Sequence, residues 1–200
     1  MVPPMVDPVL HELPAACRQA LVVRSVAGAP TRATVACYER NVGAWVMRTV
    51  RPAMVGRAGI VAAAQKREGD GGTPAGVHRL GTAFGYAPSI ATKLAYRQAT
   101  TNDYWVDDPE SPAYNTWVIG KPACSAEALR RDDDAYSLGA VIEWNTTPVV
   151  PGRGSAIFLH VWGGPGHATA GCVALARDDV AALLAWLDRD RAPFIVVVAP

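Results

Sequence analysis

His160 and Cys172 are the two residues of this 200-residue chain whose types and spacing could support nucleophilic chemistry. A thiol is a poor nucleophile until it becomes a thiolate, and a nearby imidazole can take its proton. Twelve positions separate the pair, so the loop between them must fold back for the two side chains to meet. Gly163, Gly164 and Gly166 lie in this loop and make such a bend feasible.

Residue type alone also allows a purely structural role for both side chains. Free cysteine is among the most buried residue types and often behaves as a small hydrophobic side chain. A histidine beside apolar residues is in most proteins simply packed and hydrogen-bonded. His167, inside the same loop, is an alternative base for the thiol.

Two regular elements flank this pair in the sequence. The apolar residues 156–159 predict a buried strand that ends at His160. A rigid strand followed by an irregular loop is where catalytic side chains tend to be displayed. Residues 178–188 predict the clearest helix of the chain, because Val180, Leu183 and Leu184 fall on one face. This helix starts several residues beyond Cys172, so its dipole is not expected to activate the thiol.

Short apolar runs separated by glycine and proline predict strands and turns for most of the remaining chain. Residues 31–38 and 44–50 are expected to pair as a hairpin around a turn at residues 41–43. The other expected strands cover residues 21–26, 60–64, 77–80, 140–145 and 194–198. A short helix is expected over residues 122–131. Residues 1–19 are predicted to form a proline-rich N-terminal arm, and residues 20–200 one domain.

Composition excludes several classes of function. Nineteen basic and eighteen acidic residues give a formal net charge of +1, which argues against nucleic acid or an anionic membrane as the main partner. No run approaches the roughly 20 apolar residues of a membrane span. The N-terminus lacks the early basic group of a signal peptide.

The four cysteines, Cys17, Cys37, Cys124 and Cys172, include no CxxC pair. Zinc sites usually show closer cysteine and histidine spacing, so no metal site is expected. If Cys172 is the working thiol, at most two of the other three can pair. A Cys17–Cys37 disulfide would need an oxidising compartment, and the sequence leaves this pairing open.

Residues 160–175 resemble the active-site segment of L,D-transpeptidase catalytic domains of the YkuD type. That family has a histidine at a strand end, then a loop, then Ser/Thr-x-Gly-Cys and apolar residues, and here residues 169–175 are TAGCVAL. The match departs from the commonest version at three points. Ala170 stands where many members have a second histidine, Ala174 stands where many have an arginine, and the loop is shorter. The closest resemblance is to a divergent branch of the family.

A second segment, residues 66–76 (KREGDGGTPAG), is similar to a run that recurs in the same branch, where it precedes a strand. A phosphate-binding loop is the alternative interpretation of glycines beside a lysine. The segment lacks the Gly-Lys-Ser/Thr ending of such loops, and its lysine precedes the glycines, so nucleotide binding is not expected.

The resemblance implies a mainly β, single-domain mixed β-sandwich with one or two packed helices, which acts as a peptidoglycan L,D-transpeptidase on stem peptides. Cys172 would attack the carbonyl that joins the diamino acid to the terminal D-alanine, and His160 would take the thiol proton. Backbone N–H groups at Gly171 and Cys172 would hold the oxyanion, and Thr169 would fix the loop. An amine of a second stem would resolve the thioester.

The same resemblance implies sensitivity to carbapenem-type inhibitors, no cofactor, and export to the bacterial cell wall or periplasm. Because no signal peptide is evident, we expect the sequence to be a mature or shortened form of an exported protein. Two alternatives stay open: water could resolve the thioester, as in an L,D-carboxypeptidase, or the domain could be an inactive wall-binding module. The group that orients His160, a loop carbonyl or a carboxylate, is also open.

Aromatic and acidic residues near the middle of the chain are weaker candidates for the site. Trp105 and Trp162 could line a substrate groove, although tryptophan is also ordinary core material. Asp107 and Asp108 are expected to begin a turn at the following proline. Adjacent side chains on an extended strand point apart, so the two carboxylates are not expected to act together.

Overall fold

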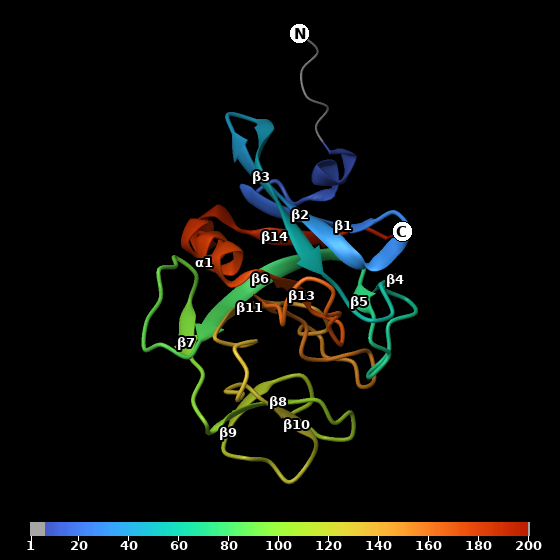
Figure 1. The fold of residues 1–200 in the computed structure, drawn as a ribbon, viewed down its shortest axis with the longest axis vertical. Helices are drawn as coiled ribbons and strands as arrows, with labels where there is room; N and C mark the ends of the chain where they lie inside the picture. The colour runs from blue at the N-terminus through green and yellow to red at the C-terminus, as the bar shows by residue number, and fades with distance from the viewer. Residues whose placement is uncertain (1–6, 200) are drawn as a thin grey trace.

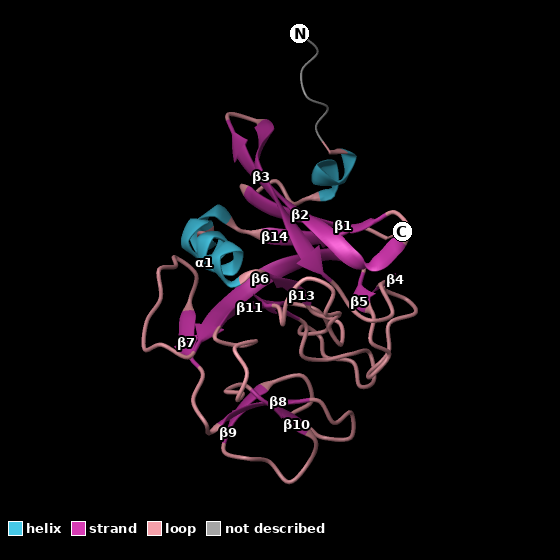
Figure 2. Ribbon diagram, in the orientation of Figure 1, coloured by secondary structure: helices cyan, strands magenta, loops and turns pink. Residues whose placement is uncertain are grey.

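The computed structural model describes residues 7–199 and consists mainly of β-strands (Figures 1 and 2). The predicted mainly β, single-domain fold with a packed helix is confirmed. The strands are β1 (Gln19–Val26), β2 (Ala29–Asn41), β3 (Ala44–Met54), β4 (Ile60–Val61), β5 (Thr73–Pro74), β6 (Gly76–Gly85), β7 (Tyr96–Gln98), β8 (Asp103–Val106), β9 (Trp117–Ile119), β10 (Ala126–Ala128), β11 (Leu138–Ile142), β12 (Phe158–Val161), β13 (Val173–Leu175) and β14 (Phe194–Val197). The helices are α1 (Arg177–Trp186) and the 3₁₀ turns η1 (Pro8–Glu12) and η2 (Arg189–Arg191).

The large sheet has the order β11-β12-β13-β3-β2-β1-β14-β6-β7. A further pairing of β11 with β6 closes the sheet into a barrel, with β7 added beside β6. The sheet contains the parallel pairs β1–β14, β12–β13 and β6–β7, and its other pairs are antiparallel, so it is mixed as predicted. A separate three-stranded sheet, β10-β8-β9, lies at the opposite end of the molecule from the β2–β3 hairpin (Figure 1).

The best-predicted elements follow from local chemistry. In the β2–β3 hairpin, Asn41 pairs with Ala44, and Val42 and Gly43 form the turn with φ of 45° and 86°. Two positive φ values are the geometry that matches the twist of a tight hairpin. Helix α1 buries Val180, Leu183 and Leu184 against the sheet, as its apolar spacing predicts.

Both faces of β1 are buried, and this ties the start of the chain to the domain. Leu21 and Val23 face the main core, whereas Ala20 and Val22 face a second cluster that contains Leu10 and Cys17. Residues 1–6 of the predicted arm lie outside the described residues. The rest of that arm packs against β1, and the division into an arm and a catalytic domain stays a prediction.

The helix predicted over residues 122–131 is wrong. Residues 126–128 form β10, whose Ala126 and Ala128 pair with Val106 and Tyr104 of β8. Helix propensity is a weak preference, and here strand pairing with β8 overrides it. The expected strands 60–64 and 140–145 are also misplaced. The first ends at Val61 because a turn follows, and the second is observed at Leu138–Ile142.

All four cysteines are free thiols, so the Cys17–Cys37 disulfide is not formed. The two side chains belong to separate core clusters, Cys17 with Leu10 and Cys37 with Leu21. Among residues 7–199, no helix is long and apolar enough to cross a lipid bilayer.

Candidate active site

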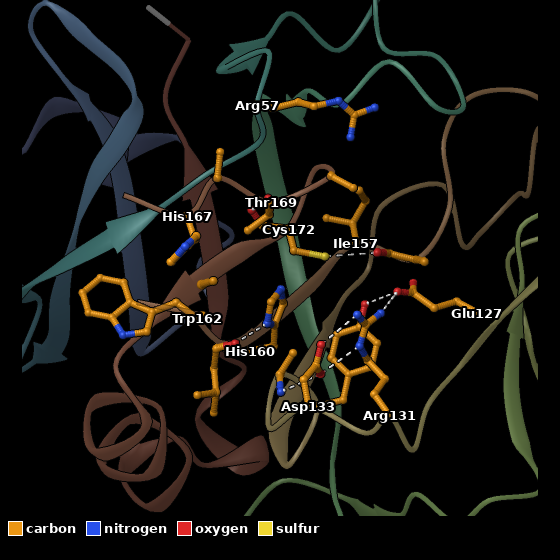
Figure 3. Close-up of a pocket in the computed structure, with 18 of the residues that line it drawn as sticks. Arg57, Glu127, Arg131, Asp133, Ile157, His160, Trp162, His167, Thr169 and Cys172 are labelled. Carbon is orange, nitrogen blue, oxygen red and sulfur yellow. Dashed lines mark hydrogen bonds and ion pairs between the residues drawn. The ribbon is translucent and has the colours of Figure 1, made fainter. Parts of the chain in front are cut away.

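The register of two parallel strands brings His160 and Cys172 to the same side of the sheet. His160 of β12 is paired with Ala174 of β13, and Leu159 is paired with Val173. Alternate residues of a strand share a face, so Cys172, two residues before Ala174, projects on the same side as His160. Both residues line one cavity of about 710 Å³ (Figure 3).

His160 is held in one orientation by the main chain and by an aromatic ring. Its Nδ1 lies 2.8 Å from the carbonyl oxygen of Val161, so Nδ1 carries the proton and Nε2 is left as an acceptor. The sequence left open whether a carbonyl or a carboxylate orients His160, and in the structure this group is the main-chain carbonyl of Val161. The ring of Tyr136 packs edge-to-face against the imidazole, with centroids 5.2 Å apart. Burial lowers the pKa of His160 to about 4, so the imidazole is neutral at pH 7.

The Cys172 thiol lies between two backbone groups. Sγ accepts from the N–H of Phe158 at 3.3 Å and donates to the carbonyl oxygen of Ala156 at 3.3 Å. Burial is the main cause that raises the pKa of Cys172 to about 12, so the thiol is neutral at pH 7. In this arrangement the S–H donates to Ala156 and not to His160, and the role of His160 as the base for the thiol stays a prediction.

The loop before Cys172 is fixed by two threonine hydroxyls. Thr169 Oγ1 accepts from the N–H of Gly171 at 3.1 Å and donates to the Cys172 carbonyl at 2.8 Å. Thr73 Oγ1 donates to the same carbonyl at 3.3 Å. Because the Gly171 N–H already has a partner, holding an oxyanion would require it to exchange that hydrogen bond. The oxyanion role of Gly171 and Cys172 stays a prediction.

The glycine-rich segment, residues 66–76, supports this loop through close backbone packing. Gly171 has φ of +147°, and a Cβ there would lie 3.0 Å from the carbonyl oxygen of Gly72. A Cβ on Gly56 would lie 2.2 Å from the carbonyl oxygen of Gly71. These glycines allow main-chain segments to approach more closely than other residues permit. The segment therefore buttresses the Cys172 loop.

The other sequence candidates divide between the cavity and the core. Trp162 and His167 line the cavity from the loop side. Trp105 does not line the cavity: it is only 6% exposed, its indole N–H donates to Asn115 Oδ1 at 2.8 Å, and its ring packs against Phe158. Asp108 accepts from the N–H of Glu110, which forms the expected turn, whereas Asp107 lines the cavity.

A group of residues of which the sequence had suggested only Asp107, as part of a turn, forms another side of the cavity. We call Asp107, Glu127, Arg131, Asp133 and Tyr136 the charged wall; all five line the cavity. Arg131 binds Asp133 through two hydrogen bonds of 2.9 Å and Glu127 Oε1 through one of 3.0 Å. The Tyr136 hydroxyl donates to the same Oε1 at 2.8 Å.

No local sequence signal marks the charged wall. Its members come from the end of β8, from β10 and from the loop before β11, and only pairing with β8 turns Glu127 inward. Because residues 122–131 were predicted to form a helix, sequence reasoning did not suggest that Glu127 and Arg131 line the cavity. Within residues 7–199, no group of three or more His, Cys, Asp and Glu side chains is arranged to hold a metal ion.

Comparisons with known proteins find one family model and similar solved structures. The family model for the L,D-transpeptidase catalytic domain (YkuD) matches residues 22–198. Bd1075 from Bdellovibrio bacteriovorus is a similar solved structure, with 16% sequence identity and a TM-score of 0.48 over 90% of this chain and 47% of that chain. The helical cell shape determining protein Pgp2 from Campylobacter jejuni has 14% identity and a TM-score of 0.47, with the same coverage of 90% and 47%.

This chain thus spans about half the length of those two structures. A comparison with curated protein sequences finds no match. The family model covers nearly the whole chain, from β1 to β14. The chain belongs to the L,D-transpeptidase catalytic domain (YkuD) family.

Proposed function

We propose that this domain is a cysteine-dependent peptidoglycan L,D-transpeptidase that forms a thioester on Cys172. The observation that carries the proposal is that His160 of β12 and Cys172, directly before β13, line one cavity. The tautomer of His160 adds support, because only Nε2 is free to receive the thiol proton. Work at the bacterial cell wall is part of the same proposal.

The first half-reaction transfers the stem peptide to sulfur. The Cys172 thiol passes its proton to Nε2 of His160 while sulfur attacks the carbonyl between the diamino acid and the terminal D-alanine. The carbon–sulfur bond forms, the carbon–nitrogen bond breaks, and His160 returns the proton to the leaving amine of D-alanine. Both groups are neutral at pH 7, so proton transfer and attack occur together rather than from a preformed ion pair.

A cation is available for the carboxylate of the donor peptide. Three basic side chains line the cavity: Lys66 is bound to Asp70, and Arg131 is bound to Asp133 and Glu127. Arg57 forms no ion pair within the described chain, and its Nη2 donates to the carbonyl oxygen of Gly69 at 3.1 Å. Ala174, where many family members have an arginine, is small and leaves this role to another residue. Arg57 fits it best.

The proposal is tested by acylation of the thiol. The protein is incubated with a carbapenem and, separately, with a tetrapeptide donor, and its mass is measured. We expect one adduct in the wild type and none in Cys172→Ala. Cys124→Ala is the matched control, because Cys124 is a partly exposed thiol elsewhere in the chain. An adduct that persists in Cys172→Ala, or a wild type that forms none, would contradict the proposal; the second result would favour an inactive binding module.

A further inference from the structure

We propose that Glu127 binds and deprotonates the amine that resolves the thioester, as a catalytic residue of the second half-reaction. This inference rests on the proposed function, since it assigns a group to the step that follows acylation. It also makes the choice between amine and water, and hence between transpeptidase and carboxypeptidase, depend on one side chain.

The position of Glu127 is set by β10. Its partner in the register of β10 and β8 is Trp105, which packs on Phe158 in the core cluster that includes Cys172. Glu127 therefore faces inward. In Figure 3 it lies on the side of Cys172 away from Trp162 and His167. An amine placed beside it would approach the thioester from the side opposite the loop.

Only one of the two carboxylate oxygens of Glu127 forms hydrogen bonds within residues 7–199. Oε1 accepts both hydrogen bonds, from Tyr136 and from Arg131, whereas Oε2 has no hydrogen-bond partner among residues 7–199. Asp107 lines the same wall, and its Oδ1 is buried without a partner in the described chain. Asp133 is already neutralised by Arg131.

Oε2 of Glu127 thus lacks a protein donor among the described residues, and because 27% of the Glu127 side chain is accessible, a ligand in the cavity can reach this oxygen. An ammonium group brings three donors and one positive charge, so it can donate to Oε2 and offset the negative charges of Glu127 and the nearby Asp107. The chemical class of ligand that this wall fits is therefore a primary ammonium, such as the side-chain amine of an acceptor stem.

The second half-reaction needs a group that can take a proton from the attacking amine. An aliphatic amine reaches the site protonated at neutral pH and then has no lone pair for attack. Burial raises the pKa of Glu127, which suits it to accept a proton. The ammonium gives one proton to Oε2, and its lone pair attacks the thioester carbonyl. The carbon–nitrogen bond forms, the carbon–sulfur bond breaks, and the second amine proton passes through His160 to sulfur. Water needs no such prior deprotonation.

A structural role is the competing explanation, because Glu127 also links β10 to Tyr136. Two variants separate the roles. Glu127→Gln keeps an acceptor oxygen for Tyr136 but removes the charge, whereas Tyr136→Phe breaks the link but leaves the carboxylate in place. Asp132→Asn is the matched control, an exposed carboxylate of the neighbouring loop that does not line the cavity.

The measurement is the ratio of cross-linked to hydrolysed product, obtained from a tetrapeptide donor with a diamino acid acceptor in excess. This ratio reports only how the thioester is resolved, whatever the rate of acylation. We expect Glu127→Gln to lower it roughly ten- to a hundred-fold, the effect of one charge-assisted hydrogen bond. Asp132→Asn should keep it near the wild-type value, and Tyr136→Phe should lower it less than Glu127→Gln does, because the carboxylate stays in place.

Hydroxylamine provides a second readout, because it is neutral at the working pH. The ratio of hydroxamate to hydrolysed product should be the same in the wild type and in Glu127→Gln. An unchanged cross-linking ratio in Glu127→Gln, an equal fall in Tyr136→Phe, or hydrolysis alone in the wild type would overturn the inference while acylation stands. A wild type without any adduct would instead overturn the proposed function, and this inference with it.

Discussion

The two sides of the cavity are built in different ways. On one side, here called the barrel wall, Cys172 and His160 are held by backbone groups, namely the carbonyls of Ala156 and Val161 and the N–H of Phe158. On the other side, the charged wall is held by side chains that bind one another, with Arg131 between Asp133 and Glu127. Backbone groups thus fix the positions of Cys172 and His160, whereas the charged wall contributes carboxylate and guanidinium groups to the cavity.

The charged wall also acts on the barrel wall electrostatically. After burial, the negative charge of Glu127 is the next cause that raises the pKa of Cys172. The positive charge of Arg131 lowers the pKa of His160, again as a smaller effect than burial. Glu127 therefore opposes the thiolate and Arg131 opposes the imidazolium, while Arg131 also lowers the pKa of Cys172 as a smaller cause. A cationic substrate group beside Glu127 would weaken that opposition, which links binding to activation of the thiol.

The largest expected effect concerns His160 of the barrel wall, the proposed general base. His160→Gln should slow acylation of Cys172 by a carbapenem by roughly 10²- to 10⁴-fold, the usual contribution of a positioned general base. The time course of adduct formation by mass spectrometry measures this rate. His167→Gln is the matched control, because His167 also lines the cavity but is exposed. A greater loss in His167→Gln would make His167 the base.

The pH dependence of stability should change with the same residue. Burial holds the pKa of His160 at about 4, below the ordinary value of 6.5. Between these values the unfolded chain binds a proton that the folded chain does not, so the free energy of unfolding falls as pH is lowered. The full difference corresponds to about 3 kcal/mol.

Urea unfolding at pH 7 and pH 4.5 tests this dependence. The wild type should lose more stability than His160→Gln between the two values. His78, whose pKa is also lowered by burial, is present in both proteins and cancels in the comparison. Equal losses in the two proteins would mean that the imidazole is not buried in its neutral form.

Backbone packing behind the thiol should tolerate little change. Gly171→Ala adds a Cβ 3.0 Å from Gly72 O at a φ of +147°, which should cost about 1–3 kcal/mol of stability. Gly166→Ala is the matched control, because its φ of +99° is also positive but no atom lies within 4 Å of the added Cβ. Thermal unfolding of both variants measures the difference. Equal destabilisation would show that strain alone, and not contact with the glycine-rich segment, limits this position.

The charged wall should matter least for stability. Asp133 is largely exposed, with 55% of its side chain accessible, and exposed ion pairs contribute roughly 0–1 kcal/mol. Asp133→Asn should therefore shift the free energy of unfolding by less than about 1 kcal/mol. Chemical denaturation of the variant measures this shift. A larger loss would mean that the wall holds the small sheet to the barrel, contrary to the functional role proposed for Glu127.

Local patterns in the sequence predicted the elements that depend on residues close together in the chain. Residues 41–43 specify their own turn, and Val180, Leu183 and Leu184 specify the buried face of α1, because both depend on neighbours within a few residues. The spacing of His160 and Cys172 likewise reflects one strand, one loop and the start of the next strand. Family resemblance then supplied the chemistry that spacing alone left open.

Contacts between distant segments decided the rest. The predicted helix over residues 122–131 became β10 because β8 offered it a partner, and that pairing is what turns Glu127 toward the cavity. Trp105 entered the core rather than the groove because Phe158 and Asn115 surround it. The orientation of His160 came from Val161 and Tyr136. A local pattern determines which elements form, but the environment of a side chain depends on what the fold packs against it, and only the tertiary structure contains that information.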